Sequence, residues 1–283
     1  LKELIENSID AGSTRIEVSI RDAGRTLLQV SDNGCGMSEA DALASLERHA
    51  TSKIRSLTDL CSARTLGFRG EAVPSIASVS RMRISTAEAE GLRVVVPVEG
   101  GTVGPLEYEA GPRGTTVTVA DLFFNTPARL RFMKSDTTEL RNAVEVVQRL
   151  AVAHPEVAFV LRNQGATLFQ TSGQGDGLHA ISGVWGSEVA RAMIPVDYSV
   201  AGVRVRGYIS PPEFTRATRA YQWLFVNGRP VRNRNLGTSV ELAYRQLTPD
   251  RRFALACLHL HLDAQSVDVN VSPTKSEVKF QHE

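Results

Sequence analysis

The sequence lacks several features that would place a protein in a class directly. Its 3 cysteines, Cys35, Cys61 and Cys257, are too few and too widely separated for a disulfide framework or paired zinc ligands, which favours a reducing intracellular compartment. No apolar run approaches the roughly 18 residues that a membrane-spanning helix needs, so we expect a soluble chain with no membrane partner. The formal net charge of only +1 does not indicate a nucleic-acid partner, so any basic surface must be found by position.

Two catalytic signatures are also absent from the sequence. There is no G-x-x-x-x-G-K-[ST] motif, which excludes a P-loop nucleotide fold, and no Ser/His/Asp order that suggests acyl transfer. Apolar residues, in contrast, are plentiful: 42% of the 283 residues are hydrophobic, enough for one or two globular domains with buried cores. Leu1 already belongs to the first predicted helix, and we expect the natural N-terminus to lie further upstream.

The first stretch of the chain has the spacing of an amphipathic helix. Four apolar residues recur at helical intervals: Leu1, Leu4, Ile5 and Ile9. Gly12 supplies a stop signal after them. Glu3, Asn7 and Asp10 follow one another at intervals of four and three residues, which brings their side chains into one stripe, with Glu6 to one side. Taken alone, such a stripe is explained by a solvated helix face.

A Gly-rich turn follows the next predicted strand. Residues 27–30 have a strand pattern, and Asp32-Asn33-Gly34 would alone form an ordinary turn, because Asn and Gly tolerate positive φ. A second glycine, Gly36, leaves no side chain in the path of a ligand that approaches the backbone. Asp32, at the end of the strand, is then placed to accept a hydrogen bond from the amino group of a base. Together the two motifs indicate one side and the floor of a nucleotide site.

The remaining pattern predicts an α+β chain of two domains. Ser38 and Asp41 begin a helix whose apolar face runs to residue 50, and Asp136 and Glu139 stand at capping-box spacing before a helix that runs to residue 153. Alternating segments between these helices are most simply an antiparallel sheet. The Gly-rich interval 172–177 is the best candidate for a domain junction. We therefore predict domains at residues 1–178 and 179–283.

The second predicted domain contains strands around one helix. Residues 198–210 and 221–231 have strand patterns, the latter with a turn at Asn227-Gly228, and a helix follows over residues 236–247. In residues 253–263, leucines on one face alternate with His259 and His261 on the other, which could be half a metal site but is more simply an exposed strand face. The last predicted strand breaks at Pro273 and holds Lys275 at a loop tip.

Six segments of the chain together resemble the N-terminal ATPase region of MutL-type DNA mismatch-repair proteins: KELIENSIDAG, DNGCGM, HATSKI, TLGFRGEA, LFFNTPAR and VDVNVSPTKSEV. The first two are shared more widely, by the gyrase-type topoisomerase, heat-shock chaperone and histidine-kinase (GHKL) ATPases. HATSK, GFRGEA and FFNTPAR resemble the MutL proteins and not the others. The resemblance covers nearly the whole chain. It implies an α+β fold, in which a Bergerat-type sandwich of helices on a mixed sheet holds ATP and a smaller domain with a βαβ crossover follows.

The resemblance also implies a role for each matching residue. Glu3 matches the general base for the attacking water, and Asn7 matches the side chain that holds Mg²⁺ against the triphosphate. Asp32 would bind the adenine amino group, with Gly36 and Met37 beneath the ring. Thr116 would support that contact from a neighbouring strand. The residues that match the lid over the phosphates are Thr51, Ser52, Lys53, Gly67, Phe68, Arg69 and Gly70.

Lys275 matches the family lysine that reaches the γ-phosphate from the second, transducer-like domain, and an exposed structural lysine is the alternative. The resemblance further implies a slow Mg²⁺-dependent ATPase that forms a homodimer when ATP binds. The dimer closes as a clamp on DNA and meets mismatch-recognition and downstream repair proteins in the bacterial cytoplasm, at the nucleoid. Because the family's upstream segment and C-terminal dimerisation region are not in this sequence, we expect the fragment to be monomeric without nucleotide.

For DNA, the best basic cluster is Arg229, Arg232 and Arg234, with Arg129, Arg131 and Lys134 as the second. Solvated surface is the alternative for both clusters. Contacts to phosphates predict sequence-independent binding that weakens with salt. Three other functions stay open: a non-hydrolysing ATP-switched DNA-binding scaffold, a topoisomerase-type ATPase domain, which would lack FFNTPAR and GFRGEA, and a histidine kinase, which needs a preceding helical hairpin with a phosphorylatable histidine.

Overall fold

The computed structural model describes residues 1–47, 70–263, 266–268 and 279–280, and the chain divides into two compact units. The first unit comprises residues 1–151 and 155–175, and the second comprises residues 152–154 and 176–283. The division between Gly175 and Asp176 lies inside the Gly-rich interval 172–177. Asp176 caps the first helix of the second unit, since its carboxylate accepts hydrogen bonds from the backbone N–H groups of Leu178 and His179.

A nine-stranded sheet forms the framework of the first unit, in the order β5-β4-β3-β7-β2-β1-β8-β9, with β6 paired to β4. The strands are β1 Arg15–Arg21, β2 Leu27–Asp32, β3 Arg81–Ala87, β4 Gly91–Glu99, β5 Thr102–Val103, β6 Glu107–Gly111, β7 Gly114–Ala120, β8 Ala158–Asn163 and β9 Ala166–Gln170. Among the described strands of this sheet, all neighbours are antiparallel except β1 and β8, which run parallel. The sheet is therefore mixed, as the resemblance implied.

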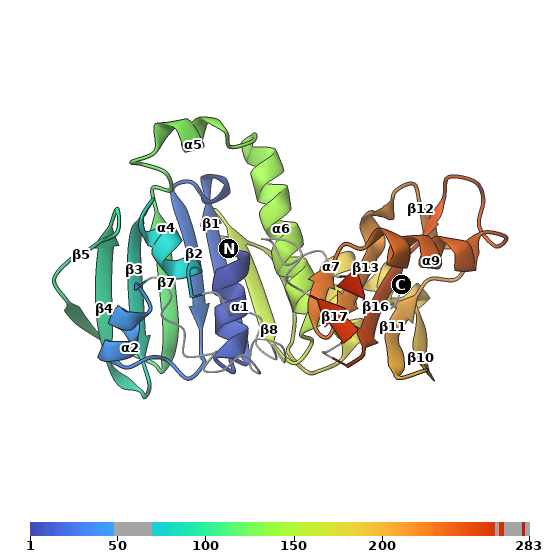
Figure 1. Ribbon diagram of the computed structural model, residues 1–283, viewed down its shortest axis with the longest axis horizontal. Coiled ribbons are helices and arrows are strands. Elements are labelled where there is room, and N and C mark those ends of the chain that lie inside the picture. The colour runs from blue at the N-terminus through green and yellow to red at the C-terminus, as the bar shows by residue number, and fades with distance from the viewer. Residues whose placement is uncertain (48–69, 264–265, 269–278, 281–283) are drawn as a thin grey trace. The chain divides into compact units, whose positions relative to one another are not determined.

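Short helices cover one face of this sheet, and Figure 1 shows α1, α2 and α4 in front of it. The described helices of the first unit are α1 Lys2–Asp10, the 3₁₀ turn η1 Asp22–Gly24, α2 Glu39–Ala44, α4 Ala72–Ala77, α5 Pro127–Arg131 and α6 Asp136–Ala153. Alternate residues of the central strands face the helices and are buried, for example Ile16 and Val18 on β1 and Ile84 on β3. Leu4 and Ile5 of α1 are also buried. This face forms the core of the unit.

Two predicted helix ends differ from those observed. Ser38 caps α2 as expected, accepting a hydrogen bond from the N–H of Asp41, but α2 ends at Ala44 and a tight turn follows. At the start of α6, the predicted capping box formed by Asp136 and Glu139 is wrong. The carboxylate of Glu139 instead accepts from the N–H of Lys134, and Asp136 forms an ion pair with an arginine of the β1–β2 hairpin.

The second unit has a five-stranded sheet in the order β10-β11-β16-β13-β14. Its elements are α7 Gly177–Trp185, α8 Ser187–Ala192, β10 Ile194–Val200, β11 Val203–Ile209, β12 Thr215–Arg216, η2 Arg219–Tyr221, β13 Gln222–Val226, β14 Arg229–Val231, α9 Arg234–Tyr244, β15 Phe253–Ala254, β16 Ala256–His261, β17 Val267–Asp268 and β18 Lys279–Phe280. Strands β13 and β16 are parallel neighbours joined through α9, which is the implied βαβ crossover. The β13–β14 hairpin turns at Asn227 and Gly228, both with positive φ, as predicted.

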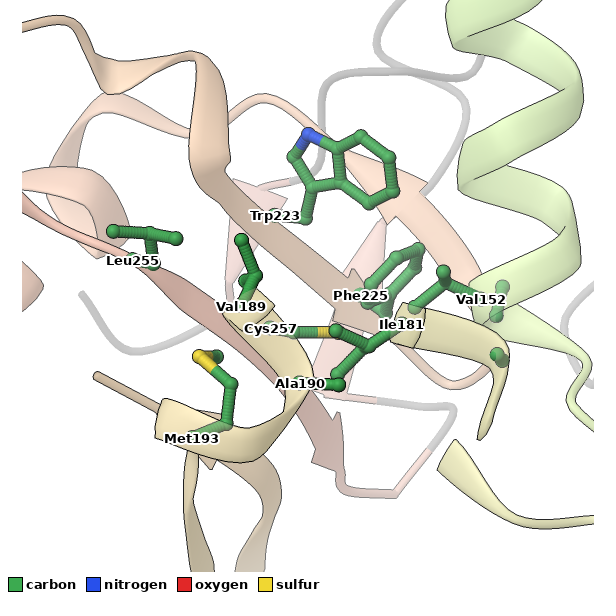
Figure 2. Close-up of a cluster of buried hydrophobic side chains, with 11 residues drawn as sticks. Val152, Ile181, Val189, Ala190, Met193, Trp223, Phe225, Leu255 and Cys257 are labelled. Carbon is green, nitrogen blue, oxygen red and sulfur yellow. The ribbon is translucent and has the colours of Figure 1, made fainter. Parts of the chain in front are cut away.

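Strand β13 is buried on both faces, so the second unit has two cores. Figure 2 shows the first core, in which Trp223 and Phe225 pack with Ile181 of α7, Val189 of α8 and the last residues of α6. The second core lies on the other face, where Leu224 and Val226 pack with residues of α9. Within the part of the chain that the structure describes, no helix is both long and apolar enough to cross a membrane.

Candidate nucleotide-binding site

Helix α1 presents the predicted polar stripe. Glu3, Asn7 and Asp10 are all half-buried, while Leu4 and Ile5 are fully buried. The helix stops at Gly12, whose φ is +70°, and two reversed backbone hydrogen bonds of the Schellman type satisfy its last carbonyls. The predicted helix and its stop signal are therefore confirmed.

Glu6, at the side of this stripe, is more deeply buried than Glu3, Asn7 and Asp10. Its side chain is only 1% exposed, and a carboxylate oxygen lies 3.4 Å from the ammonium group of Lys2, one turn earlier. A buried carboxylate needs such a cation, because burial without one is costly. Glu3 is thus the more accessible of the two glutamates.

Asp32 is fixed by donors from three elements. Its Oδ2 accepts a hydrogen bond of 2.7 Å from the hydroxyl of Ser8 on α1. Its Oδ1 accepts from the backbone N–H of Gly34 at 2.9 Å, which forms the turn, and from that of Thr115 on β7 at 3.4 Å. A carboxylate has about four acceptor positions, so it can still accept one further donor. A base amino group is such a donor.

Asn33 has a structural role in the same turn. Its side-chain oxygen accepts from the N–H groups of both Thr14 and Arg15 at 2.9 Å, and its amide nitrogen donates to the hydroxyl of Thr14. The Asx turn and these bonds hold the loop against the start of β1. The predicted turn at residues 32–34 is therefore present and rigidly supported.

Gly36 of this turn and Gly114, which packs against it at the start of β7, are required by contacts within the protein. Gly36 has a φ of +72°, and a Cβ atom placed there would lie 1.9 Å from the carbonyl oxygen of Ala87. A Cβ on Gly114 would lie 2.1 Å from the carbonyl oxygen of Asp32. Close packing of the turn against β3 is therefore the observed reason for a glycine at position 36, and the approach of a ligand there stays a prediction.

The prediction that Thr116 supports Asp32 is wrong by one residue. Asp32 pairs with Thr115 across β2 and β7, so the side chain of Thr116 lies on the opposite face of the sheet. There its hydroxyl shares a hydrogen bond with that of Ser31 and accepts one from Arg93. Thr115 instead faces the turn.

The hydroxyl of Thr115 belongs to a small network that holds the residue after Gly36. Thr115 Oγ1 lies 2.9 Å from Thr86 Oγ1, and Thr86 Oγ1 accepts a hydrogen bond of 2.9 Å from the backbone N–H of Met37. Sequence reasoning missed Ser8, Thr86 and Thr115. For Ser8 one signal was available, because a hydroxyl on the apolar side of α1 needs a buried partner.

Most of the predicted phosphate-contacting residues lie outside the described residues. These are Thr51, Ser52, Lys53, Gly67, Phe68 and Arg69, together with Lys275. Gly70 is described, with a φ of +62° just before α4. Among the residues that the structure describes, no three His, Cys, Asp or Glu side chains gather as a metal site. Mg²⁺ in nucleotide sites needs few protein ligands, and the amide oxygen of Asn7 is one of suitable chemistry.

The three arginines of the predicted DNA-binding cluster do not share one exposed surface. Arg229 is only 5% exposed on β14, so its place in an exposed phosphate-contacting cluster is wrong. Arg232 and Arg234 are exposed, the latter at the start of α9, where Asn233 caps the helix. The second cluster, Arg129, Arg131 and Lys134, is also exposed.

Comparisons with known proteins identify the family of the chain. Residues 1–95 match the family model for histidine kinase-, DNA gyrase B- and HSP90-like ATPases, and residues 181–283 match that for the C-terminal domain of DNA mismatch repair proteins. The DNA mismatch repair protein MutL of Geobacillus thermodenitrificans is 50% identical over 283 residues, which are 100% of this chain and 44% of that protein. The chain thus spans less than half the length of this curated relative.

Solved structures give the same result. A crystal structure of the N-terminal domain of a DNA repair protein has a TM-score of 0.84 and 27% identity, covering 99% of this chain and 87% of that one. The Aquifex aeolicus MutL ATPase domain complexed with ADP has a TM-score of 0.70 and 26% identity, covering 92% and 89%. The chain therefore belongs to the MutL family of DNA mismatch-repair proteins, as its N-terminal GHKL-type ATPase region.

Proposed function

We propose that this region binds ATP with Mg²⁺, hydrolyses it slowly, and uses the nucleotide to join two copies as a clamp on DNA during mismatch repair. The observation that carries the proposal is the fixed carboxylate of Asp32 beside the polar stripe of α1. Ser8, which holds Asp32, follows Asn7 directly on that helix, so α1 carries both the polar stripe and the residue that orients Asp32.

Each residue has a distinct task in this proposal. Asp32 accepts from the adenine amino group, while Gly36 and Met37 form the backbone beneath the ring. Glu3 acts as general base for the attacking water, and phosphoryl transfer requires mainly such positioning and charge neutralisation. Mg²⁺, held by Asn7, would neutralise charge on the triphosphate when bound. Gly70 ends the lid formed with the other residues of segments 51–53 and 67–70, and Lys275 reaches the γ-phosphate from the transducer-like second domain.

The proposal is tested by steady-state ATP hydrolysis and nucleotide binding of the wild type, Glu3→Ala and Asn7→Ala. We expect Glu3→Ala to bind ATP and lose at least about a hundredfold in turnover, the usual contribution of a general base. Asn7→Ala should lose the Mg²⁺-dependent part of binding. If Glu3→Ala hydrolyses ATP as fast as the wild type, the catalytic role is refuted. If the wild type binds ATP without hydrolysis, the region is the nucleotide-switched scaffold instead.

Dimerisation and DNA binding need separate measurements. Addition of a non-hydrolysable ATP analogue should shift the chain from monomer to dimer in analytical ultracentrifugation. For DNA, Arg232 and Arg234 are the exposed candidates, and their contacts to phosphates should make binding salt-sensitive and independent of sequence. The mismatch-recognition and downstream repair partners, and a bacterial cytoplasmic location at the nucleoid, are part of the same proposal.

The DNA site is tested by charge reversal at the start of α9 and just before it. Arg234→Glu and Arg232→Glu should weaken DNA binding about tenfold at low salt while nucleotide binding persists. Arg245→Glu is the matched control, because Arg245 is exposed at the other end of the same helix. Equal losses for all three variants would show a general charge effect and remove this segment as the DNA site.

A further inference from the structure

Ser8 is a buried hydroxyl with an uncommon choice of partner. The residue is 4% exposed, and its Oγ lies 2.7 Å from Asp32 Oδ2 and 3.3 Å from the carbonyl oxygen of Leu4. A serine hydroxyl has one hydrogen, and a mid-helix serine commonly donates it to the carbonyl four residues earlier. Here the shorter distance is to the carboxylate, and a hydrogen bond to a charged acceptor is the stronger one.

The bond joins two elements that are 24 residues apart in sequence. Because the other carboxylate oxygen is held by the N–H groups of Gly34 and Thr115, both ends of the Asp32 carboxylate have a fixed donor. The terminal torsion of an aspartate side chain ordinarily has a broad range of angles. Here, rotation of the carboxylate about it would break at least one of these hydrogen bonds. The plane of the carboxylate is therefore set by the protein before any ligand arrives.

We propose that Ser8 is a positioning residue for base selection: through Asp32 it fixes the acceptor that distinguishes a purine with a 6-amino group from one without. The proposal rests on the proposed contact between Asp32 and the base. A carboxylate oriented in this way offers acceptors only, so it favours the amino group of adenine and repels the 6-carbonyl oxygen of guanine. Ser8 acts through Asp32 and does not itself touch the nucleotide.

Removal of the hydroxyl should loosen this selection. In Ser8→Ala the backbone donors of Gly34 and Thr115 remain, so the turn keeps its path, but Oδ2 loses its fixed donor and the carboxylate can rotate. We expect ATP affinity to fall about tenfold, the size of one charge-assisted hydrogen bond. Purine riboside triphosphate, which has hydrogen in place of the 6-amino group, should bind with unchanged affinity.

Ser13→Ala is the matched control. Ser13 is also buried, at 5% exposed, and its hydroxyl donates to the backbone carbonyl of Ser8 at 2.6 Å, without contact to Asp32. Its loss disturbs the same end of α1, so a purely structural effect should appear in both variants. Ser8→Cys keeps the volume and offers a weak donor, and it serves if Ser8→Ala does not fold.

The test is the ratio of affinities for ATP, GTP and purine riboside triphosphate, measured by calorimetry on the full chain. The inference predicts that the preference for ATP over both competitors falls in Ser8→Ala, and less in Ser8→Cys, but stays constant in Ser13→Ala. An unchanged preference in the Ser8 variants, or an equal loss for all three ligands, would overturn it. If the wild type itself shows no preference for ATP over purine riboside triphosphate, the proposed contact of Asp32 with the base fails instead.

Discussion

The turn after β2 and the segment after β13 both follow a strand, half-buried in β2 and buried in β13, and both carry polar residues that the sequence predicted to be functional. In the turn, Asp32 meets donors from three elements and its two sides are fixed. In the segment, Arg229 is buried on the strand while Arg234 is exposed on the following helix. Residues that are close in sequence gather in one site only where their side chains point to the same side of the backbone. In a strand, successive side chains point to opposite faces of the sheet.

The largest expected effect concerns the glycine that packs the turn against β3. Gly36→Ala places a Cβ atom 1.9 Å from a backbone oxygen at a φ of +72°, so we expect a loss of about 3 kcal/mol or more in the free energy of unfolding. Gly165→Ala is the control, because its φ is +83° but no atom lies within 4 Å, and it should cost about 1 kcal/mol. Urea denaturation measures both. Equal losses would mean that backbone strain, and not packing, requires the glycine.

The next effect distinguishes Arg229 from Arg234 in the segment after β13. Arg229→Ala removes a buried charged side chain and should destabilise the protein by about 2 kcal/mol. Arg234→Ala, at an exposed position, should change stability by less than about 0.5 kcal/mol and act instead on DNA affinity. Thermal unfolding and DNA titration on the same samples check the pair. A strong loss of DNA affinity in a stably folded Arg229→Ala would contradict the division.

A smaller effect tests the two faces of β7. Thr115→Val removes a hydroxyl from the network of Thr86 and Met37 and should weaken ATP binding by about tenfold at most. Thr116→Val, on the opposite face, should leave ATP affinity within about twofold. The comparison uses the same nucleotide titration for both variants. The reverse order of effects would restore Thr116 as the supporting residue.

The smallest effect concerns a buried phenol of the second unit. Burial raises the pKa of Tyr244, whose hydroxyl donates to the carbonyl oxygen of Ser210. An acid with a raised pKa in the folded state stabilises the fold fully below its ordinary pKa near 10, and that contribution is lost as pH rises. Stability should therefore fall as the pH rises above about 10, and it should fall less steeply in Tyr244→Phe. An identical slope in both proteins would remove Tyr244 as a cause.

Local signals predicted much of the fold. The stop of α1 at Gly12, the cap of α2 at Ser38 and the hairpin at Asn227-Gly228 each depend on a few neighbouring residues, and the structure has all three. The signals that failed depend on residues far away in sequence. Burial of Arg229 requires a folded second unit, and the start of α6 is altered by an ion pair between Asp136 and Arg25.

The candidate site was predicted in part for the same reason. Glu3, Asn7 and Asp32 follow from spacing and family resemblance, and they occupy a half-buried stripe and a fixed turn. Ser8 and Thr115 did not follow, because their contact with Asp32 depends on how α1 packs on the sheet and on the register of β2 against β7. Strand register depends on the tertiary structure. A difference of one residue in this register places Thr116, the predicted threonine, on the other face of the sheet.

The last residues of α6 have a practical consequence for dissecting the protein. Val152 and Ala153 belong to the core that contains Ile181 and Phe225, although they precede the last residues of the first unit in the chain. A fragment of the second unit that begins at the Gly-rich interval would lack these two side chains, and their loss would open a cavity in its core. No single cut therefore releases both units intact, and limited proteolysis there would yield a weakened second unit.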